Sequence, residues 1–459
     1  MAAGSGNGGG VHAQKVCGFF LQHKGRPCRM LVKAGRRYCG QHLVEENSEE
    51  TTGKHKRIPC PLDPKHSCFE HRLDHHLTIC NARVVTDLPH LRLNCNLRVC
   101  GEYMPAKVSL SSLPDEVLLA FITKLERIHA DAIDAVRESI MCLDAVEAVI
   151  AECCGSPSMV RHLRQTSSLL AHLKAANLLD TATNSTCYVE FGAGRGQLTK
   201  SLTEAVTDIS KALFVLIDRG AQRYKYDTKL RYNQSINVKR FRVDIQHLSL
   251  EGVEGSEDYQ HIVGLGKHLC GSASDLALRC LCQHPGMQVV GVVLALCCHH
   301  RCVWDSYCGL EVLQGLGVQP SEFYILTALT GWATCNSKDV PSKEEMTSEP
   351  RNTDSFGMNA SQEKHPELLS PKETMTRKNL VDNRYTRLNL AAQHREEIGR
   401  KAKQVLDYGR MQYMREQGFE CSLVQYVAKD TTPENVALIA SRVPRKGIQE
   451  PVQSLEEEI

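Results

Sequence analysis

Cysteine and histidine residues near the start of the chain form two groups of four that could each bind a metal ion. The first group is spaced C-x10-C-x10-C-x2-H and consists of Cys17, Cys28, Cys39 and His42. The second group is spaced C-x5-H-x9-H-x3-C and consists of Cys60, His66, His76 and Cys80. Four thiolate or imidazole ligands close a tetrahedron around Zn²⁺ in structural sites. The sequence therefore predicts two zinc sites.

Three further side chains compete for the second site, namely Cys68, His71 and His75. His76 and Cys80 are one helical turn apart, so both can face one ion. On a helix His75 points about 100° away from His76, so only one of these two histidines can bind. We therefore assign His76 to the site.

The composition of residues 1–100 also favours bound metal. These residues include 15 Lys and Arg against 8 Asp and Glu, and they hold 8 of the 21 Cys and 9 of the 20 His. They lack long apolar runs, so metal rather than a hydrophobic core must supply their folding energy. The cysteine total is odd and no signal peptide opens the chain, which argues against a disulfide scaffold. We expect reduced thiols and an intracellular protein, in the nucleus or the cytoplasm, that is not secreted.

The rest of the composition is that of a folded globular protein. The 459 residues are 42% hydrophobic and 24% charged with a net charge of +2, which excludes a wholly disordered chain and a polycation. The longest apolar run, at 289–298, is about half the length that crosses a bilayer, so we expect no membrane partner.

A glycine-rich turn follows a short apolar strand in the segment Tyr-Val-Glu-Phe-Gly-Ala-Gly-Arg-Gly-Gln-Leu at 188–198. Glycines allow the backbone to turn sharply and to approach a ligand closely. Those of this turn are Gly192, Gly194 and Gly196. Such a turn is found in nucleotide-binding folds generally, and by itself it does not select one cofactor. No P-loop sequence is present, which disfavours ATP hydrolysis of that kind.

Acidic residues at the ends of three successive predicted strands sharpen this interpretation. Glu190 suits the methionine end of S-adenosylmethionine (SAM), and Asp218 suits its two ribose hydroxyls. Asp244 and Ile245 can flank the adenine. The pattern therefore predicts a SAM site in preference to an NAD site or a turn without a ligand.

Strand and helix signals alternate from about residue 156, as in a Rossmann-like α/β domain with a parallel sheet. The expected strands lie at 188–191, 213–217, 240–243, 261–265 and 289–296. Helices are expected at 159–179 and 396–417. Runs at 421–427 and 435–440 then predict a closing antiparallel hairpin, which is characteristic of SAM-dependent methyltransferases.

These signals divide the chain into a first zinc finger, a second zinc finger, a helical or coiled-coil segment, a methyltransferase domain and a flexible tail, at 14–45, 57–84, 113–150, 156–445 and 446–459. The methyltransferase domain contains a polar insertion at about 336–383. In the helical segment Leu118, Phe121 and Leu125 recur at steps of three and four. A short coiled coil and a spacer helix packed on the next domain both fit this repeat.

Lys267 and His268 follow the fourth predicted strand, at the edge where open α/β sheets bind substrates. A hydroxyl is a poor nucleophile while it is protonated, so methyl transfer to it needs a base or a nearby positive charge. A lysine of lowered pKa, a charged lysine or a histidine can meet this need. These two residues are the candidate catalytic groups, and a solvated lysine beside a packed imidazole is the alternative.

The motifs together resemble a known enzyme family. The first zinc group is similar to the CCCH finger of the eukaryotic tRNA acceptor-stem 2′-O-methyltransferase family, and the second resembles the CHHC finger of RNA-associated proteins, including a minor-spliceosome component. The α/β domain resembles the same methyltransferase family in the segments 190–194, 266–271, 296–302, 398–402 and 407–410. The resemblance covers nearly the whole chain apart from the insertion and the tails, and it points to the vertebrate form of the family.

This resemblance implies methylation of the ribose 2′-hydroxyl at the fourth nucleotide of certain tRNAs, with SAM as donor and tRNA as partner; no DNA partner is expected. The positive excess of the first 100 residues independently suits phosphate contact. The segment Cys-Cys-His-His-Arg-Cys at 297–302 holds a third set of possible metal ligands. Its adjacent side chains point in different directions, so we expect it to shape an RNA-facing pocket, with Arg301 on a phosphate.

Two other functions fit parts of the sequence. A base methyltransferase could use Cys270 or Cys297 as a covalent nucleophile on a pyrimidine ring. A non-catalytic RNA adaptor could combine the zinc fingers with a decayed Rossmann domain, although the glycine and carboxylate positions of the cofactor site are all present.

Overall fold

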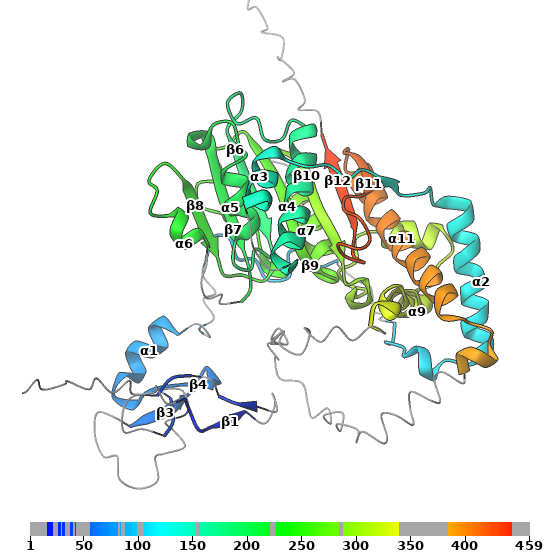
Figure 1. The fold of residues 1–459 in the computed structure, drawn as a ribbon, viewed down its shortest axis with the longest axis horizontal. Helices are drawn as coiled ribbons and strands as arrows, with labels where there is room; N and C mark the ends of the chain where they lie inside the picture. The colour runs from blue at the N-terminus through cyan, green and yellow to red at the C-terminus, as the bar shows by residue number, and fades with distance from the viewer. Residues whose placement is uncertain are drawn as a thin grey trace, which may run out of the picture. The chain divides into compact units, whose positions relative to one another are not determined.

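In the computed structural model the described residues are 16–21, 26–28, 30–32, 37–39, 42, 56–80, 83, 88–98, 105–152, 157–220, 226–283, 288–338 and 384–442. They belong to two units, one within residues 1–87 and the other within residues 88–459 (Figure 1). The predicted tail at 446–459 and all but the first three residues of the predicted insertion at about 336–383 lie outside the described residues.

The first unit consists of short strands around buried cysteines. β1 (Phe20–Leu21) pairs antiparallel with β2 (Arg26–Pro27), and β3 (Arg57–Cys60) pairs antiparallel with β4 (Asp63–Phe69). α1 (Leu73–Ile79) follows β4 after a turn of 3-10 helix. Among the described residues of this unit, the buried ones are all cysteines. This is expected of a segment whose folding energy comes from bound metal.

An eight-stranded sheet forms the centre of the second unit, in the order β5-β11-β12-β10-β9-β6-β7-β8. Its strands are β5 (Arg137–Glu138), β6 (Thr186–Phe191), β7 (Ala212–Ile217), β8 (Asn237–Phe241), β9 (His261–Cys270), β10 (Val289–Cys297), β11 (Glu420–Gln425) and β12 (Val436–Ser441). Neighbours among β6 to β10 pair in parallel, whereas β12 runs antiparallel to β10 and β11. The predicted parallel sheet with a closing antiparallel hairpin is confirmed, although β8 ends two residues before its predicted end.

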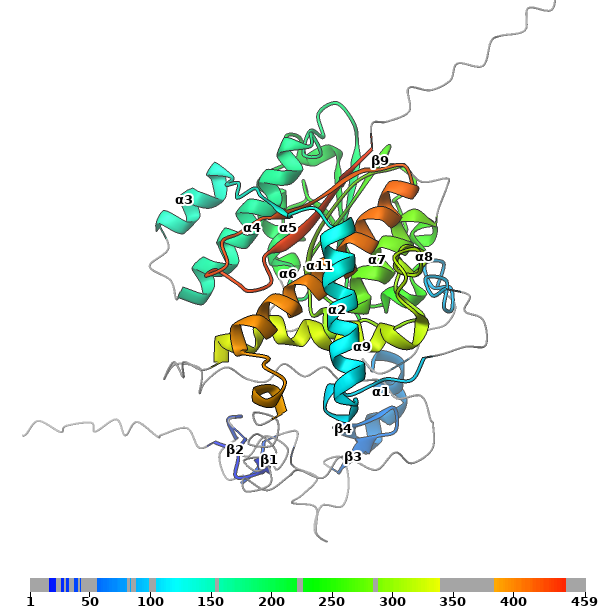
Figure 2. The same cartoon turned by 90° about the vertical axis from the view of Figure 1, so that its right-hand side faces the viewer.

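Helices cover both faces of this sheet. α3 (Asp144–Glu152), α4 (Pro157–Ala175) and α5 (Gln197–Thr203) pack on one face, and α7 (Ser272–Cys282) packs on the other (Figure 2). Side chains of a strand alternate between the two faces of the sheet. Tyr188 of β6 therefore packs in the core under α4 and α5, and its neighbour Val189 packs in the core under α7. Within the described part of the chain, none of the helices is both long and apolar enough to span a membrane.

α2 (Asp115–Ala132) buries the apolar face predicted from Leu118, Phe121 and Leu125. This face enters a third core together with residues of α9 (Phe323–Leu329) and α11 (Ala392–Glu416). Figure 2 shows α2 beside α11. The helix is therefore packed on the following domain, which is the second of the two alternatives, and the predicted helical segment at 113–150 also contains β5 and most of α3.

Two glycines allow α11 to approach its neighbours closely. A Cβ atom at Gly399 would lie 2.2 Å from the backbone nitrogen of Ala333, in the 3-10 helix η10 (Thr330–Lys338). A Cβ atom at Gly409 would lie 2.2 Å from the hydroxyl oxygen of Tyr307. Real Cβ atoms do not come so close to other heavy atoms, so a larger residue at either position would push α11 outward.

We predict that Gly399→Ala lowers the free energy of unfolding by about 1–3 kcal/mol, because the added methyl group forces α11 away from η10. Gly315→Ala, at the end of α8 (Leu310–Gly315), is the matched control, since nothing lies within 4 Å of its Cβ position. The control should be neutral or stabilised by up to about 1 kcal/mol, because alanine has fewer unfolded conformations than glycine. Urea unfolding measures both variants. Equal stabilities would contradict this close packing.

Candidate active site and zinc centres

The first predicted zinc group comes together in the structure. The sulfur atoms of Cys17 and Cys39 each lie 3.4 Å from Nδ1 of His42, and the sulfur atoms of Cys28 and Cys39 are 4.0 Å apart. The four ligand atoms all lie within 4.8 Å of one another. Such separations suit the corners of a tetrahedron around one Zn²⁺ ion. The backbone N–H of Cys39 also donates to the sulfur of Cys17, as is common for a thiolate ligand.

Three of the four residues of the second group also meet. The sulfur of Cys60 lies 3.6 Å from that of Cys80 and 3.2 Å from Nε2 of His76. His76 and Cys80 come from the end of α1 and the residue after it, as their spacing predicted. The fourth predicted ligand, His66, belongs to β4, but its side chain lies outside the described part of the structure.

The glycine turn follows β6 and leads into α5. Gly192, Gly194 and Gly196 all have positive φ angles, of 62°, 51° and 77°. A Cβ atom at Gly196 would lie 2.7 Å from a methyl group of Leu216, so this glycine is needed for packing. At Gly194 the nearest atom is 4.0 Å away, and the space in front of the turn is open. The turn can therefore accept a ligand against its backbone at Gly194.

Asp218 stands directly after β7 and beside this turn. Its carboxylate accepts hydrogen bonds of 2.7 Å from the backbone N–H of Gly194 and from that of Gly220. The side chain is only half-buried, and each oxygen can accept a further hydrogen bond. The predicted ribose-binding carboxylate is thus fixed at the mouth of the turn.

A buried ion pair beneath the turn was not predicted from the sequence. Arg240 of β8 donates to both carboxylate oxygens of Asp227, in α6 (Tyr226–Leu230), at 3.1 and 2.8 Å. The same guanidinium donates to the backbone oxygen of Gly194 at 3.0 Å. Because a bidentate arginine is rigidly oriented, this pair fixes the position of the turn. The two residues are 13 positions apart and carry no motif, so only the tertiary structure reveals them.

Glu190 is buried behind the turn, where it caps the start of α5. Its carboxylate accepts hydrogen bonds from the backbone N–H and the hydroxyl group of Thr199. Burial raises the pKa of Glu190 to about 7, against the lowering effect of these hydrogen bonds. Its described contacts therefore hold the glycine turn to α5.

Asp244 and Ile245 lie in the connection that follows β8. The carboxylate of Asp244 accepts a hydrogen bond of 3.0 Å from the backbone N–H of Gln246, and the side chain of Ile245 is buried. The backbone N–H of Asp218 donates to the backbone oxygen of Phe241, which brings the ends of β7 and β8 together. All the predicted cofactor-binding residues thus belong to the carboxyl ends of neighbouring strands.

Lys267 lies near the end of β9 and points toward α4. Its amino group donates to the backbone oxygen of His162 at 2.7 Å and to the hydroxyl oxygen of Thr166 at 3.2 Å. Burial lowers the pKa of Lys267 to about 7, although the charge of Glu190 opposes this shift. His268 is exposed, and its ring lies 5.7 Å from that of His162.

The segment after β10 is anchored by a network of buried charges. Arg410 of α11 donates to both carboxylate oxygens of Asp275 in α7, at 3.0 and 2.8 Å, and to Asp407 at 2.9 Å. His299 lies 2.6 Å from the same oxygen of Asp407. The sulfur of Cys302 lies 3.0 Å from the Arg410 guanidinium. His299 and Cys302 therefore belong to the buried interior, which removes them from any metal site or RNA-facing surface at this segment.

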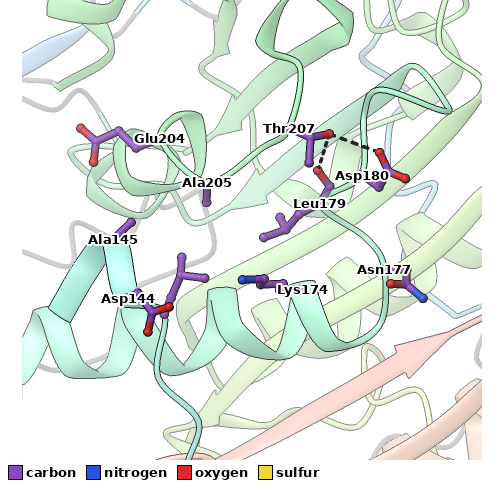
Figure 3. Close-up of a pocket in the computed structure, with 10 residues that line it drawn as sticks. Asp144, Ala145, Lys174, Asn177, Leu179, Asp180, Glu204, Ala205 and Thr207 are labelled. Atoms are coloured by element: carbon purple, nitrogen blue, oxygen red, sulfur yellow. Dashed lines mark hydrogen bonds between the residues drawn. The ribbon is translucent and has the colours of Figure 1, made fainter. Parts of the chain in front are cut away.

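A hollow of about 430 Å³ is found at the opposite edge of the sheet (Figure 3). Asp180 precedes β6 and Thr207 precedes β7, so both line this hollow from the amino ends of the strands. The hydroxyl of Thr207 lies 3.3 Å from Asp180. Open α/β sheets bind ligands at the carboxyl ends, and none of the predicted site residues lines this hollow.

Comparison with known proteins shows which family the chain belongs to. Residues 164–441, more than half of the chain, match the family described as "Methyltransferase TRM13". The chain belongs to the TRM13 methyltransferase family. Residues 15–43 match "CCCH zinc finger in TRM13 protein", and residues 57–81 match "U11-48K-like CHHC zinc finger". The predicted family, the methyltransferase fold and the two zinc fingers are thereby confirmed.

Relatives of the TRM13 family match along most of the chain. The mouse "tRNA:m(4)X modification enzyme TRM13 homolog" is 32% identical, over 92% of this chain and 94% of that protein. The human protein of the same name is also 32% identical, over 94% and 95%. Among solved structures, a Burkholderia thailandensis 1,6-didemethyltoxoflavin-N1-methyltransferase is 12% identical, with a TM-score of 0.21 over 43% of this chain and 71% of that chain. A score this low carries no weight for fold or ligand.

The zinc fingers lead to a prediction about metal content. Cys17→Ser and Cys60→Ser should each remove one equivalent of zinc per chain, because each breaks one ligand set and the two sets are separate. Cys68→Ser is the matched control, since Cys68 is a buried cysteine of the same unit that lies outside both described ligand sets. Elemental analysis of the purified protein measures all three variants. Loss of zinc in the control, or retention in either of the others, would contradict the assignment.

Proposed function

We propose that this protein transfers a methyl group from SAM to the ribose 2′-hydroxyl of nucleotide 4 in the acceptor stem of certain tRNAs. The main support is the glycine turn with Asp218 at its mouth, in a chain of the TRM13 methyltransferase family. The names of the mouse and human relatives, tRNA:m(4)X modification enzymes, support tRNA as substrate and position 4 as target. The proposal that the 2′-hydroxyl is the methyl acceptor rests on the resemblance of the sequence motifs to those of the tRNA acceptor-stem 2′-O-methyltransferase family.

The residues at the carboxyl edge of the sheet fit SAM. Gly194 offers open space against its backbone, and the carboxylate of Asp218 has acceptor capacity left for two ribose hydroxyls. Asp244, partly exposed beside the end of β8, is the residue that we assign to the adenine, because the side chain of Ile245 is buried in the core. Glu190 acts on the methionine end indirectly, because it holds α5 and the glycine turn in place. When bound, SAM supplies an electrophilic methyl group on sulfur.

Lys267 is the proposed general base. A neutral lysine amine has two N–H groups and one lone pair, and two hydrogen-bond acceptors, His162 and Thr166, already bind its N–H groups. The lone pair is then left to accept a proton from the 2′-hydroxyl. With a pKa of about 7 the amine is neutral in a large fraction of molecules at physiological pH, as an efficient base requires. His268, exposed beside it, is placed to contact the substrate phosphate or ribose.

The zinc fingers provide the proposed RNA-binding surface. Residues 1–100 contain 15 Lys and Arg against 8 Asp and Glu, while the whole chain has a net charge of only +2. Positive charge is thus concentrated in the part of the chain that carries the two fingers. Contacts of this kind to RNA phosphates weaken as salt concentration rises.

Incubation of the protein with labelled SAM and tRNA lacking the modification tests this function. We expect label in the acceptor stem at nucleotide 4, in a dinucleotide that resists alkali, because a 2′-O-methyl group removes the nucleophile of alkaline cleavage. Label in a base with an alkali-labile backbone would favour the base methyltransferase instead. SAM binding without transfer to any tRNA, or no SAM binding at all, would favour the RNA adaptor.

The role of Lys267 predicts a dependence on pH. Lysine is active as a base only when neutral, so the rate of methyl transfer at saturating substrates should rise with pH and level off above about 7. Lys267→Met and Lys267→Arg should both lower this rate by roughly 10²–10⁴-fold, because arginine stays protonated. Lys174→Met, an exposed lysine at the opposite edge of the sheet, is the control and should keep the rate. Full activity of Lys267→Arg would instead assign Lys267 an electrostatic role.

A further inference from the structure

Three cysteine sulfurs meet at the carboxyl ends of β9 and β10. They belong to Cys270, Cys297 and Cys298, and all lie within 4.8 Å of one another. Within the described part of the chain, this is the one group of three cysteines that could bind a metal outside the zinc fingers. The group differs from the ligands suggested by the sequence segment 297–302, because it adds a residue of a neighbouring strand and omits His299 and Cys302.

The strand register brings the first two thiols together. β9 and β10 are parallel neighbours, and Cys270 stands opposite Cys297 in their pairing. The backbone N–H of Gly271 donates to the backbone oxygen of Cys297 at 3.2 Å, which holds the two strand ends together. A Cβ atom at Gly271 would lie 2.6 Å from Cβ of Arg301, so the segment after β10 lies directly against the end of β9. The pair is therefore positioned by the backbone of the sheet itself.

An unusual backbone conformation adds the third thiol. Consecutive side chains of a strand point to opposite faces, so Cys297 and Cys298 would diverge in an extended chain. Instead Cys298 has φ 53° and ψ 41°, in the left-handed region, and this turn carries its sulfur to the same point as that of Cys297. This conformation corrects the expectation that adjacent side chains of this segment point in different directions and make a poor site for one metal ion.

The left-handed conformation is itself a sign of function at Cys298. In the described chain four non-glycine residues have positive φ, namely Asn94, Asn177, Cys298 and Asn389. Asparagine tolerates this region because its short side chain bonds locally, whereas cysteine has no such compensation. Strain of this kind persists where the surrounding structure imposes it, and it clusters at functional sites.

We propose that Cys270, Cys297 and Cys298 bind a Zn²⁺ ion through three thiolates at the substrate-binding edge of the sheet. Thiolates select soft or borderline ions, and zinc accepts the tetrahedral arrangement that three converging sulfurs begin. Cys270 is exposed, so the fourth position opens toward solvent for water or for a substrate oxygen. Three protein ligands with one open position are the pattern of reactive rather than purely structural zinc sites.

Buried contacts prepare this site without the metal. The thiol of Cys297 donates to the backbone oxygen of Leu269 at 3.5 Å, a bond that it gives up when it binds metal as a thiolate, and His299, directly after Cys298, is fixed by Asp407. Both ends of the left-handed turn are therefore anchored in the interior. The metal site does not depend on the proposed function, because metal binding can be measured without SAM or tRNA.

Elemental analysis of the full-length protein tests the proposal. The wild type should contain three equivalents of zinc per chain, two in the fingers and one in this site. Cys298→Gly should contain two equivalents, and because glycine adopts the left-handed conformation without strain, the turn itself is kept. Asn389→Gly is the matched control, since it relieves a positive φ without removing a thiol, and it should keep three equivalents. Cys270→Ser should also lose one equivalent.

Two results would overturn the proposal. One is a wild-type protein with two equivalents of zinc that Cys298→Gly leaves unchanged. The other is a disulfide between Cys270 and either of its partners, found by mass spectrometry of protein purified under reducing conditions. Because none of these measurements involves methyl transfer, a protein with three zinc ions and no activity on tRNA would refute the proposed function alone.

Discussion

Parallel pairing of β9 with β6 on one side and β10 on the other is the constraint on which the rest of this domain depends. Parallel neighbours end at the same edge of a sheet, so side chains from distant parts of the sequence meet there. This pairing brings the glycine turn after β6, Lys267 at the end of β9 and Cys297 at the end of β10 to one edge. At the opposite edge the parallel strands begin, and the loops that precede β6 and β7 carry Asp180 and Thr207 of the hollow, which contains none of the predicted groups.

Buried charges then fix the elements that cover this edge. Arg410 joins α11 to α7 through Asp275 and to the turn after β10 through Asp407 and His299. Each of these side chains is at most 2% exposed. Removing one partner from such a network would leave an uncompensated buried charge, which typically costs about 3–5 kcal/mol. The network therefore commits α11 and the cysteine-rich turn to a single arrangement, at a place where small displacements would misplace Lys267 or the thiols.

Structural features that depend on a short stretch of sequence were predictable, whereas features that depend on contacts between distant residues were not. The strands, the glycine turn and the zinc fingers follow from local spacing, and the structure and family matches confirm them. The Arg240–Asp227 pair under the turn is made by tertiary contact between residues without a motif. The thiol cluster was missed because an extended backbone was assumed at Cys298, although Cys270 and Cys297 both end adjacent strands and could have been paired on that signal. The contacts of Glu190 with Thr199 also required the structure.

Amide hydrogen exchange of the full-length protein, with and without saturating SAM, tests the central claim that the carboxyl edge of the sheet binds the methyl donor. Bound SAM should slow exchange in the glycine turn at 191–196, after β7 at 218–220 and at the end of β9 at 267–271. Exchange should stay unchanged at 174–180 and 204–207, which line the hollow at the amino edge. Protection at the hollow alone, or none at the glycine turn, would contradict this claim.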